Sequence, residues 1–226
     1  MDNQLTKKND RILSHLNWVL HDRLFSEESM YEFVAKTAGE KGLSSTIKVL
    51  PLMKEYHKGQ TRKGPNNIPF INHPLLMACH ALTLGLADDN LIAAILLHDV
   101  CEDCDVEPAE LPVNETIRQL VDYLTYTELP GETEDDAHAR YYKRISENTY
   151  ATIIKIIDRC NNVTSMAAAF TPEHMISYIN ETEKYVLPLL EILKNKEDGK
   201  YFNTAFLLKY HMLSVLESDK HILALM

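Results

Sequence analysis

Four polar side chains that directly follow an apolar run could carry the chemistry of this chain. Residues 91–97 are all apolar, His98 and Asp99 come next, and Glu102 and Asp103 follow within about one helical turn. Charged groups at the edge of an apolar core are costly unless they are paired or bind a metal ion. His98 and Asp99 offer a nitrogen and an oxygen ligand, whereas Glu102 and Asp103 are candidates for acid–base chemistry. On a continuous helix, His98 would share a face with Glu102, and Asp99 with Asp103.

Two further residues extend this group to a possible set of metal ligands. His73 is followed by a proline, which favours an extended histidine at the entrance to the next helix. Asp158 ends the largely apolar run 153–157. Taken alone, His73 is more often a hydrogen-bonded histidine, and Asp158 is more often an ion-pair partner of Lys155 or Arg159. Their combination with the histidine–aspartate pair predicts a divalent-metal site assembled from several helices.

The elements that position these residues are predicted to be helices, because apolar residues recur at helical spacing nearly throughout the chain. Glycine is scarce, with 7 residues, which disfavours a β-rich fold. Ser26, Asp88 and Thr171 stand where N-caps are expected. We therefore expect an all-α helical bundle with the metal site at converging helix ends. The predicted helices span residues 5–24, 27–38, 44–58, 73–85, 88–103, 113–127, 136–147, 149–168, 172–194 and 200–218.

Composition and charge limit the class of protein. The 226 residues are 45% hydrophobic and 25% charged, which is ordinary for a soluble globular protein. No apolar run approaches the roughly 20 residues that span a bilayer, and no signal-peptide core is present, so we predict a cytoplasmic protein without a membrane partner. The 4 cysteines are expected to be free thiols. The net charge of −10 argues against binding of duplex nucleic acid through a broad basic face.

The order of these motifs resembles that of the HD-domain metal phosphohydrolases. More specifically, it is similar to the hydrolase domain of the RelA/SpoT homologues, which removes the 3′-pyrophosphate from the alarmones ppGpp and pppGpp. The likeness is carried by five segments, which are His57-x-Gly59-Gln60-x-Arg62-Lys63, Pro69-Phe70-Ile71-Asn72-His73-Pro74, Ala93-x-x-Leu96-Leu97-His98-Asp99-x-x-Glu102-Asp103, Lys155-Ile156-x-Asp158-Arg159-x-x-Asn162 and Tyr178-x-x-Glu181-Thr182-x-x-Tyr185.

The resemblance implies a division of the chain into three parts. The HD hydrolase domain is expected at residues 45–195, where the likeness lies. Residues 1–44 are then expected to be an N-terminal helical extension that packs on the domain, and residues 196–226 a C-terminal helix. A synthetase domain would not fit in the remaining length, so we expect a small stand-alone alarmone hydrolase.

The resemblance also implies roles for the residues of the site. Glu102 and Asp103 match the pair that positions and activates the attacking water. The residues that match the ligands of one metal ion, typically Mn²⁺, are His73, His98, Asp99 and Asp158. This implied set agrees with the metal site that the residue types alone predict.

The substrate that the resemblance implies is a guanine nucleotide with a diphosphate at each end of the ribose. Arg62 and Lys63 match the loop that contacts the nucleotide, Asn162 matches a residue on the ribose and base side of the pocket, and Tyr178 matches a phosphate-contacting tyrosine. An acidic protein needs local cations to bind such an anion. Four cations could offset the charge of the substrate, namely Arg62, Lys63, Lys155 and Arg159.

Two segments depart from the pattern of the family. Cys101 and Cys104 flank the Glu-Asp pair, where the family more often has an aliphatic residue and a threonine. Formally they form a CxxC motif, but without a second pair a role as small hydrophobic side chains is favoured over metal binding. The linker 128–136 is acidic where a more basic stretch is expected near the phosphates.

Three other functions agree with some of these residues. An antitoxin-type hydrolase would reverse the product of a cognate toxic synthetase, such as a modified nucleotide or a pyrophosphorylated tRNA. A different HD nucleotide phosphohydrolase would keep the metal ligands but give Arg62, Lys63 and Asn162 no task. A non-catalytic binding module would not need the Glu-Asp pair.

Overall fold

The computed structural model describes residues 26–64 and 67–226, and this part of the chain contains helices and no β-strand. The all-α prediction is confirmed, whereas the helix predicted at 5–24 lies outside the described residues. The α-helices are α2 (Glu27–Lys41), α3 (Ser44–Tyr56), α4 (Asn72–Thr83), α5 (Asp89–Leu97), α6 (Val100–Asp103), α7 (Glu115–Leu124), α8 (Glu134–Glu147), α9 (Thr149–Ala169), α10 (Pro172–Glu181), α11 (Leu187–Asn195) and α12 (Phe202–Ala224). Shorter turns of other helix types span Pro108–Glu110, Thr182–Val186 and Lys196–Gly199.

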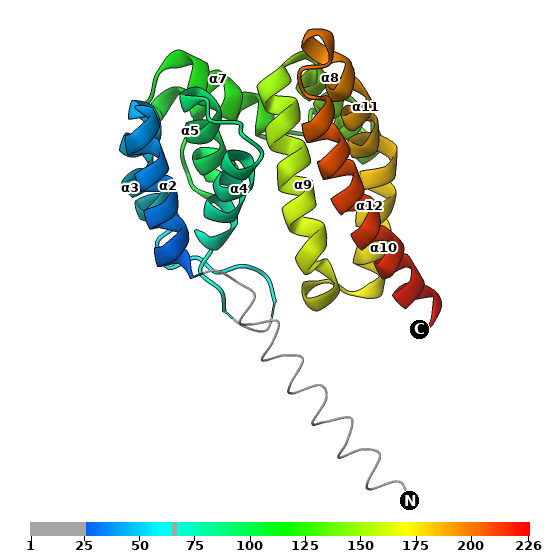
Figure 1. Cartoon of the computed structure of the whole chain (residues 1–226). Helices are drawn as coiled ribbons and strands as arrows, with labels where there is room; N and C mark the ends of the chain where they lie inside the picture. Colours follow the sequence, from blue (N-terminus) through cyan, green and yellow to red (C-terminus); the bar gives the residue numbers. More distant parts are fainter. Residues whose placement is uncertain (1–25, 65–66) are drawn as a thin grey trace, which may run out of the picture.

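Helix α9 is the central element of the bundle. Figure 1 shows α2–α5 on one side of it and α10–α12 on the other. Along its length α9 contacts α4, α5 and α7 as well as α8, α11 and α12. The isoleucines of its run 153–157 are fully buried. The apolar residues 91–97 of α5 are buried as well, with at most 1% of each exposed. The two runs that precede the candidate ligands are therefore core segments, and the polar residues that follow them are held at the edge of that core.

Local capping explains where several helices begin. The side chains of Ser26, Asp88 and Thr171 each accept a hydrogen bond from a backbone N–H in the first turn of α2, α5 and α10, as the sequence predicted. Helix α3 is capped from another element, because the Asp89 carboxylate accepts the Ser45 N–H at 2.9 Å and the Thr46 N–H at 2.8 Å. This contact ties the start of α3 to the start of α5.

The last two predicted helices, 172–194 and 200–218, differ from the structure. The segment predicted as one helix at 172–194 passes through a π-helical turn, Thr182–Val186, before α11. Pro188 in the first turn of α11 has no N–H to donate, which favours a different hydrogen-bond pattern in the preceding turn. Helix α12 continues to Ala224, beyond the predicted end at residue 218.

None of the described helices is both long and apolar enough to cross a membrane. The division into parts at residues 1–44, 45–195 and 196–226 stays a prediction.

Candidate active site

A break between α5 and α6 determines how the His-Asp pair is presented. The sequence predicted one helix over 88–103, and this is wrong: α5 ends at Leu97, His98 is its C-cap, and Asp99 is the N-cap of α6. The Asp99 carbonyl accepts hydrogen bonds from the N–H groups of Glu102 and Asp103, at 3.1 and 2.9 Å. The four polar residues therefore surround a helix break, and the two predicted i,i+4 pairs do not lie on one regular helix.

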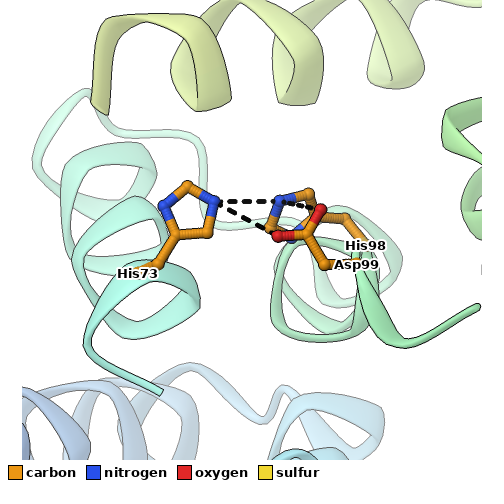
Figure 2. A group of neighbouring side chains, drawn as sticks. All are labelled: His73, His98 and Asp99. Atoms are coloured by element: carbon orange, nitrogen blue, oxygen red, sulfur yellow. Dashed lines mark hydrogen bonds and ion pairs between the residues drawn. The ribbon is translucent and has the colours of Figure 1, made fainter. Parts of the chain in front are cut away.

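The candidate metal ligands meet at one point, as Figure 2 shows for three of them. Nε2 of His73 lies 3.2 Å from Nε2 of His98, and 3.4 Å from an Asp99 carboxylate oxygen. Nε2 of His98 lies 2.9 Å from the other Asp99 oxygen. Oδ1 of Asp158 lies 3.3 Å from Nε2 of His73 and 3.9 Å from Nε2 of His98. Residues from the start of α4, the α5–α6 break and the interior of α9 thus converge.

Both histidines turn Nε2 toward the cluster because Nδ1 has a partner elsewhere. Nδ1 of His98 is 2.9 Å from the carbonyl oxygen of Ile95, one turn earlier in α5. A carbonyl can only accept, so this contact puts a proton on Nδ1 and leaves Nε2 as the nitrogen that can offer a lone pair to a metal ion. Nδ1 of His73 is 2.5 Å from Oδ1 of Asn161, on α9. With the exposed fractions of the His73 and His98 side chains at 1% and 4%, both contacts are shielded from water.

Asp158 is held on both of its oxygens. Oδ2 accepts a hydrogen bond from the Lys155 ammonium at 3.0 Å, and Oδ1 accepts one from Nδ2 of Asn162 at 2.6 Å. Burial alone would raise the pKa of Asp158, but Lys155 and the neighbouring histidines outweigh it and hold this pKa well below its usual value. The carboxylate is therefore charged, and its orientation is fixed by its own helix.

The electrostatics of the cluster favour a positive charge at its centre. Burial lowers the pKa of His98, but Asp99 and Asp158 more than offset this effect and raise it to about 9. The same contact with His98 lowers the pKa of Asp99 against the effect of burial. Two imidazole nitrogens and two carboxylates around one point form the ligand set expected for a divalent cation such as Zn²⁺, Mn²⁺ or Fe²⁺. The buried cluster thus fits a divalent metal ion.

A pocket of about 620 Å³ opens beside this cluster. Its wall includes Asp99 from the cluster and, from the predicted catalytic and substrate-binding residues, Glu102, Asp103, Arg62, Lys63, Asn162 and Tyr178. These residues come from the loop after α3 and from α6, α9 and α10, so the fold brings together positions up to 116 residues apart (62 to 178). Lys155 is not among the residues that line the pocket.

The Glu102–Asp103 pair lies at the edge of the pocket, and the pKa of each carboxyl group is raised. Desolvation raises the pKa of Glu102, and Lys155 offsets part of this effect. Desolvation and the negative charge of Asp99 raise the pKa of Asp103. An oxygen of Glu102 accepts the backbone N–H of Tyr126 at 2.5 Å, which fixes its side chain. Carboxylates with raised pKa values beside a metal-binding cluster are suited to accepting a proton near neutral pH.

The loop between α3 and α4 positions Arg62 across the pocket. The backbone closes through Arg62 N–H to the carbonyl of Ile68 at 2.8 Å and Phe70 N–H to the carbonyl of Gln60 at 2.9 Å. The Arg62 guanidinium donates to Oδ1 of Asn162 at 2.8 Å and lies over the Phe70 ring, 5.9 Å from its centre. The amide of Asn162 therefore joins a cation of the pocket to the carboxylate of Asp158.

The two remaining cations have structural partners. Lys155 pairs with Asp158 and lies over the ring of Tyr141, 5.4 Å from its centre. Arg159 is buried, donates to Glu181 at 2.5 Å, and covers the ring of Tyr178 at 3.8 Å from its centre. The expectation that Arg159 offsets substrate charge directly is not supported by this geometry, and a contact of Lys155 with substrate stays a prediction. Tyr178 lines the pocket with its ring held by Arg159.

The cysteines that flank the Glu-Asp pair are free thiols, as predicted. Desolvation raises the pKa of the Cys101 thiol to about 11 and also raises that of Cys104. Sγ of Cys104 donates to the carbonyl of Tyr56 at 3.3 Å. Protonated thiols are poor nucleophiles and poor metal ligands, which agrees with a packing role for this motif.

Several residues of the site were not predicted from the sequence. Asn161 contacts a predicted ligand, and Phe70, Ser165 and Phe170 line the pocket. Phe70 lies in one of the five segments that carry the family resemblance, but no sequence pattern pointed to Asn161. Its position on the inner face of α9, three residues after Asp158, could have indicated it.

Comparison with known proteins assigns the chain to a family. A Xenopus tropicalis protein named guanosine-3′,5′-bis(diphosphate) 3′-pyrophosphohydrolase MESH1 is 32% identical over 123 residues, which cover 53% of this chain and 67% of the relative. The chain belongs to the guanosine-3′,5′-bis(diphosphate) 3′-pyrophosphohydrolase family. No family model matches it.

Other relatives agree with this membership. The bifunctional (p)ppGpp synthase/hydrolase SpoT of Escherichia coli K12 is 24% identical over 169 residues, which cover 72% of the chain and 24% of that enzyme. This member of the pyrophosphohydrolase family thus spans about a quarter of the bifunctional enzyme. A solved structure described as a metazoan ortholog of SpoT that hydrolyzes ppGpp aligns with a TM-score of 0.61. At 18% identity, over 77% of this chain and 94% of the other, that likeness shows a shared fold.

Proposed function

We propose that the chain removes the 3′-diphosphate of ppGpp and pppGpp, that it releases pyrophosphate and leaves GDP or GTP, and that its metal ion is Mn²⁺. One observation carries the proposal: a pocket of about 620 Å³, a suitable volume for a nucleotide, is lined by Glu102, Asp103 and Arg62 beside the His-Asp cluster. The substrate class is that of the relatives named as guanosine-3′,5′-bis(diphosphate) 3′-pyrophosphohydrolases.

The metal ion would be held by the four residues of the cluster. These are His73, His98, Asp99 and Asp158, whose imidazole nitrogens and carboxylate oxygens form a set that suits a divalent ion. When bound, such an ion supplies Lewis acidity at the 3′ phosphoester and lowers the pKa of nearby water. Lys155 would act from behind Asp158, because it holds that carboxylate in its charged form.

Glu102 and Asp103 would manage the proton of the attacking water. The water oxygen forms a bond to the phosphorus on the ribose 3′ oxygen, and the bond between that phosphorus and the 3′ oxygen breaks. The water proton passes to a carboxylate, and the 3′ oxygen leaves with the bonding electrons and gains a proton. The raised pKa values of Glu102 and Asp103 bring these groups closer to neutral pH, where proton transfer is most effective.

The nucleotide would be bound by the opposite wall of the pocket. Arg62 is held by Asn162 and Phe70, so its guanidinium is already oriented toward the space beside the cluster. Planar guanidinium groups bind phosphate through two parallel hydrogen bonds, and Lys63 adds a second cation on the same loop. Tyr178 would contact the substrate from α10.

Release of pyrophosphate from ppGpp by the purified chain tests the proposal. We expect release with Mn²⁺, none with a chelator, and a roughly 10²- to 10⁴-fold lower rate in Asp103→Asn and Glu102→Gln. Asp105→Asn is a matched control, since Asp105 is an exposed carboxylate two residues further along and does not line the pocket. No release by folded, metal-loaded protein would refute the proposal.

A substrate panel separates this function from the alternatives that the sequence left open. Pyrophosphorylated tRNA and modified nucleotides test a role opposite a cognate toxic synthetase. Nucleoside monophosphates and NADPH test a different nucleotide phosphohydrolase. The proposal requires ppGpp or pppGpp to be the preferred substrate of the panel.

A further inference from the structure

The two candidate histidine ligands meet the same chemical requirement in different ways. A histidine that binds a metal ion through Nε2 must carry its proton on Nδ1, and a hydrogen-bond acceptor at Nδ1 stabilises that form. His98 has a backbone acceptor, the carbonyl of Ile95. His73 has a side-chain acceptor, Oδ1 of Asn161 at 2.5 Å. Only the second arrangement depends on the identity of one replaceable residue.

Asn161 is the acceptor that favours a proton on Nδ1 of His73. Within the described residues, Asn161 is the hydrogen-bond partner recorded for Nδ1 of His73, and the His73 ring is 1% exposed. On the other side of the ring, Nε2 faces Nε2 of His98 at 3.2 Å and carboxylate oxygens of Asp99 and Asp158 at 3.4 and 3.3 Å, which are the atoms that would share a metal ion with it. An amide turned the other way would donate its N–H to Nδ1 and force the proton to Nε2, where it would block a metal ion.

Helix α9 makes this contact possible. Asp158 and Asn161 are three residues apart, so both lie on the face of α9 that is turned toward the start of α4. Asn161 also lines a mostly apolar cavity behind the cluster, together with Thr164, whose hydroxyl donates to the Asn161 backbone carbonyl. The side-chain amide therefore lies between the cluster and this cavity.

We propose that Asn161 is a positioning residue that fixes the Nδ1–H form of His73 and thereby sets the affinity of the cluster for a divalent metal ion. The inference rests on the metal-dependent part of the proposed function and on no assumption about the substrate. Removal of the acceptor should weaken metal binding roughly 10- to 100-fold, as for other groups that orient a metal-binding histidine.

Calorimetric titration of the metal-free full chain with Mn²⁺ tests this proposal. We expect Asn161→Ala to bind roughly 10- to 100-fold more weakly than the wild type. Asn161→Asp keeps an acceptor and adds charge to the hydrogen bond, so it should retain the affinity. Thr164→Ala is the matched control, because it alters the same cavity and leaves the amide in place. Thermal unfolding with a chelator verifies that each variant is folded.

A spectroscopic measurement separates positioning from a general loss of structure. In the diamagnetic Zn²⁺-loaded chain, NMR should show slowly exchanging Nδ1–H signals for His73 and His98. Asn161→Ala should lose the signal of His73 and keep that of His98, whose acceptor is a backbone carbonyl. Wild-type Mn²⁺ affinity in Asn161→Ala, or equal losses in Asn161→Asp or Thr164→Ala, would overturn the proposal. Neither measurement uses the nucleotide, so a chain that failed to hydrolyse ppGpp could still confirm or refute it.

Discussion

Replacement of Glu181 by leucine is expected to destabilise the fold by about 3 kcal/mol, because it leaves the Arg159 guanidinium buried without its counter-ion. The pair joins α9 to the end of α10, with an N–O distance of 2.5 Å and side-chain exposures of 3% for Arg159 and 19% for Glu181. Glu181 also accepts the hydroxyl of Tyr142 at 2.6 Å. Loss of one partner of a buried pair costs roughly 3–5 kcal/mol, and the partial exposure of Glu181 favours the lower value.

Chemical and thermal unfolding measure this effect. For a chain of this size, 1 kcal/mol corresponds to about 2–4 °C in Tm, so Glu181→Leu should lower Tm by about 6–12 °C. The double variant Arg159→Met with Glu181→Leu should recover much of this loss, because it removes both charges together. Glu40→Leu is the control, since the Lys36–Glu40 pair is exposed and should contribute nothing measurable.

Two results would refute the reasoning about Arg159. If Glu181→Leu were as stable as the wild type, the guanidinium would not depend on its carboxylate partner. If the double variant were less stable than Glu181→Leu, Arg159 would contribute through its stacking on Tyr178 more than it costs as a buried charge.

Three further predictions follow from the contacts of the site and of its supporting helices. Arg62→Ala should lower kcat/KM for ppGpp by about 10- to 100-fold, mainly through KM in steady-state assays, because it removes a charge-assisted hydrogen bond to the substrate. Saturation with Mn²⁺ at about 100 times its Kd should stabilise the wild type by roughly 2.7 kcal/mol in unfolding experiments and should not stabilise His98→Ala to the same extent. Asp89→Asn should cost about 1 kcal/mol at pH 7, since an amide keeps only one of the two oxygens that accept the N–H groups of Ser45 and Thr46 at the start of α3. Desolvation raises the pKa of Asp89, but the hydrogen bonds from Thr46 and Ser45 outweigh it and hold this pKa below its usual value. The stability advantage of the wild type should therefore be complete above about pH 5 and should disappear as the pH falls below about 4. A constant difference in stability across that range would contradict this assignment.

Local sequence signals were sufficient for the parts of the fold that depend on neighbouring residues. The caps at Ser26, Asp88 and Thr171 are where the sequence predicted them, because a capping side chain bonds to a backbone group two or three residues away. The cap of α3 could not be predicted in this way. It comes from Asp89, more than 40 residues along the chain, and only the packing of α3 on α5 brings it there.

The helix break at His98 shows where apolar periodicity is insufficient. Residues 91–97 are buried on all sides, and no glycine or proline marks the end of the run. Periodicity therefore predicted one helix to residue 103. The break at Asp99, where the backbone is held by the N–H groups of Glu102 and Asp103, was not visible in the pattern of residue types.

The candidate ligands were predictable as a set, but the partners of the cations were not. His73, His98, Asp99 and Asp158 stand at the ends of apolar segments, where a buried polar group requires an explanation. Arg159 is a cation on α9, the helix that also carries Asp158 and Asn162, so its type and position alone agree with a substrate-binding role. Its pairing depends on Glu181 of α10, a tertiary contact that no spacing within α9 reveals.

Product analysis tests the central claim most directly. The chain is incubated with ppGpp and Mn²⁺, and the products are separated by anion exchange and identified by ³¹P NMR. The account predicts equal amounts of GDP and pyrophosphate, formed only when the metal ion is present. Release of inorganic phosphate, loss of phosphate from the 5′ end, or an unchanged substrate with folded, metal-loaded protein would contradict it.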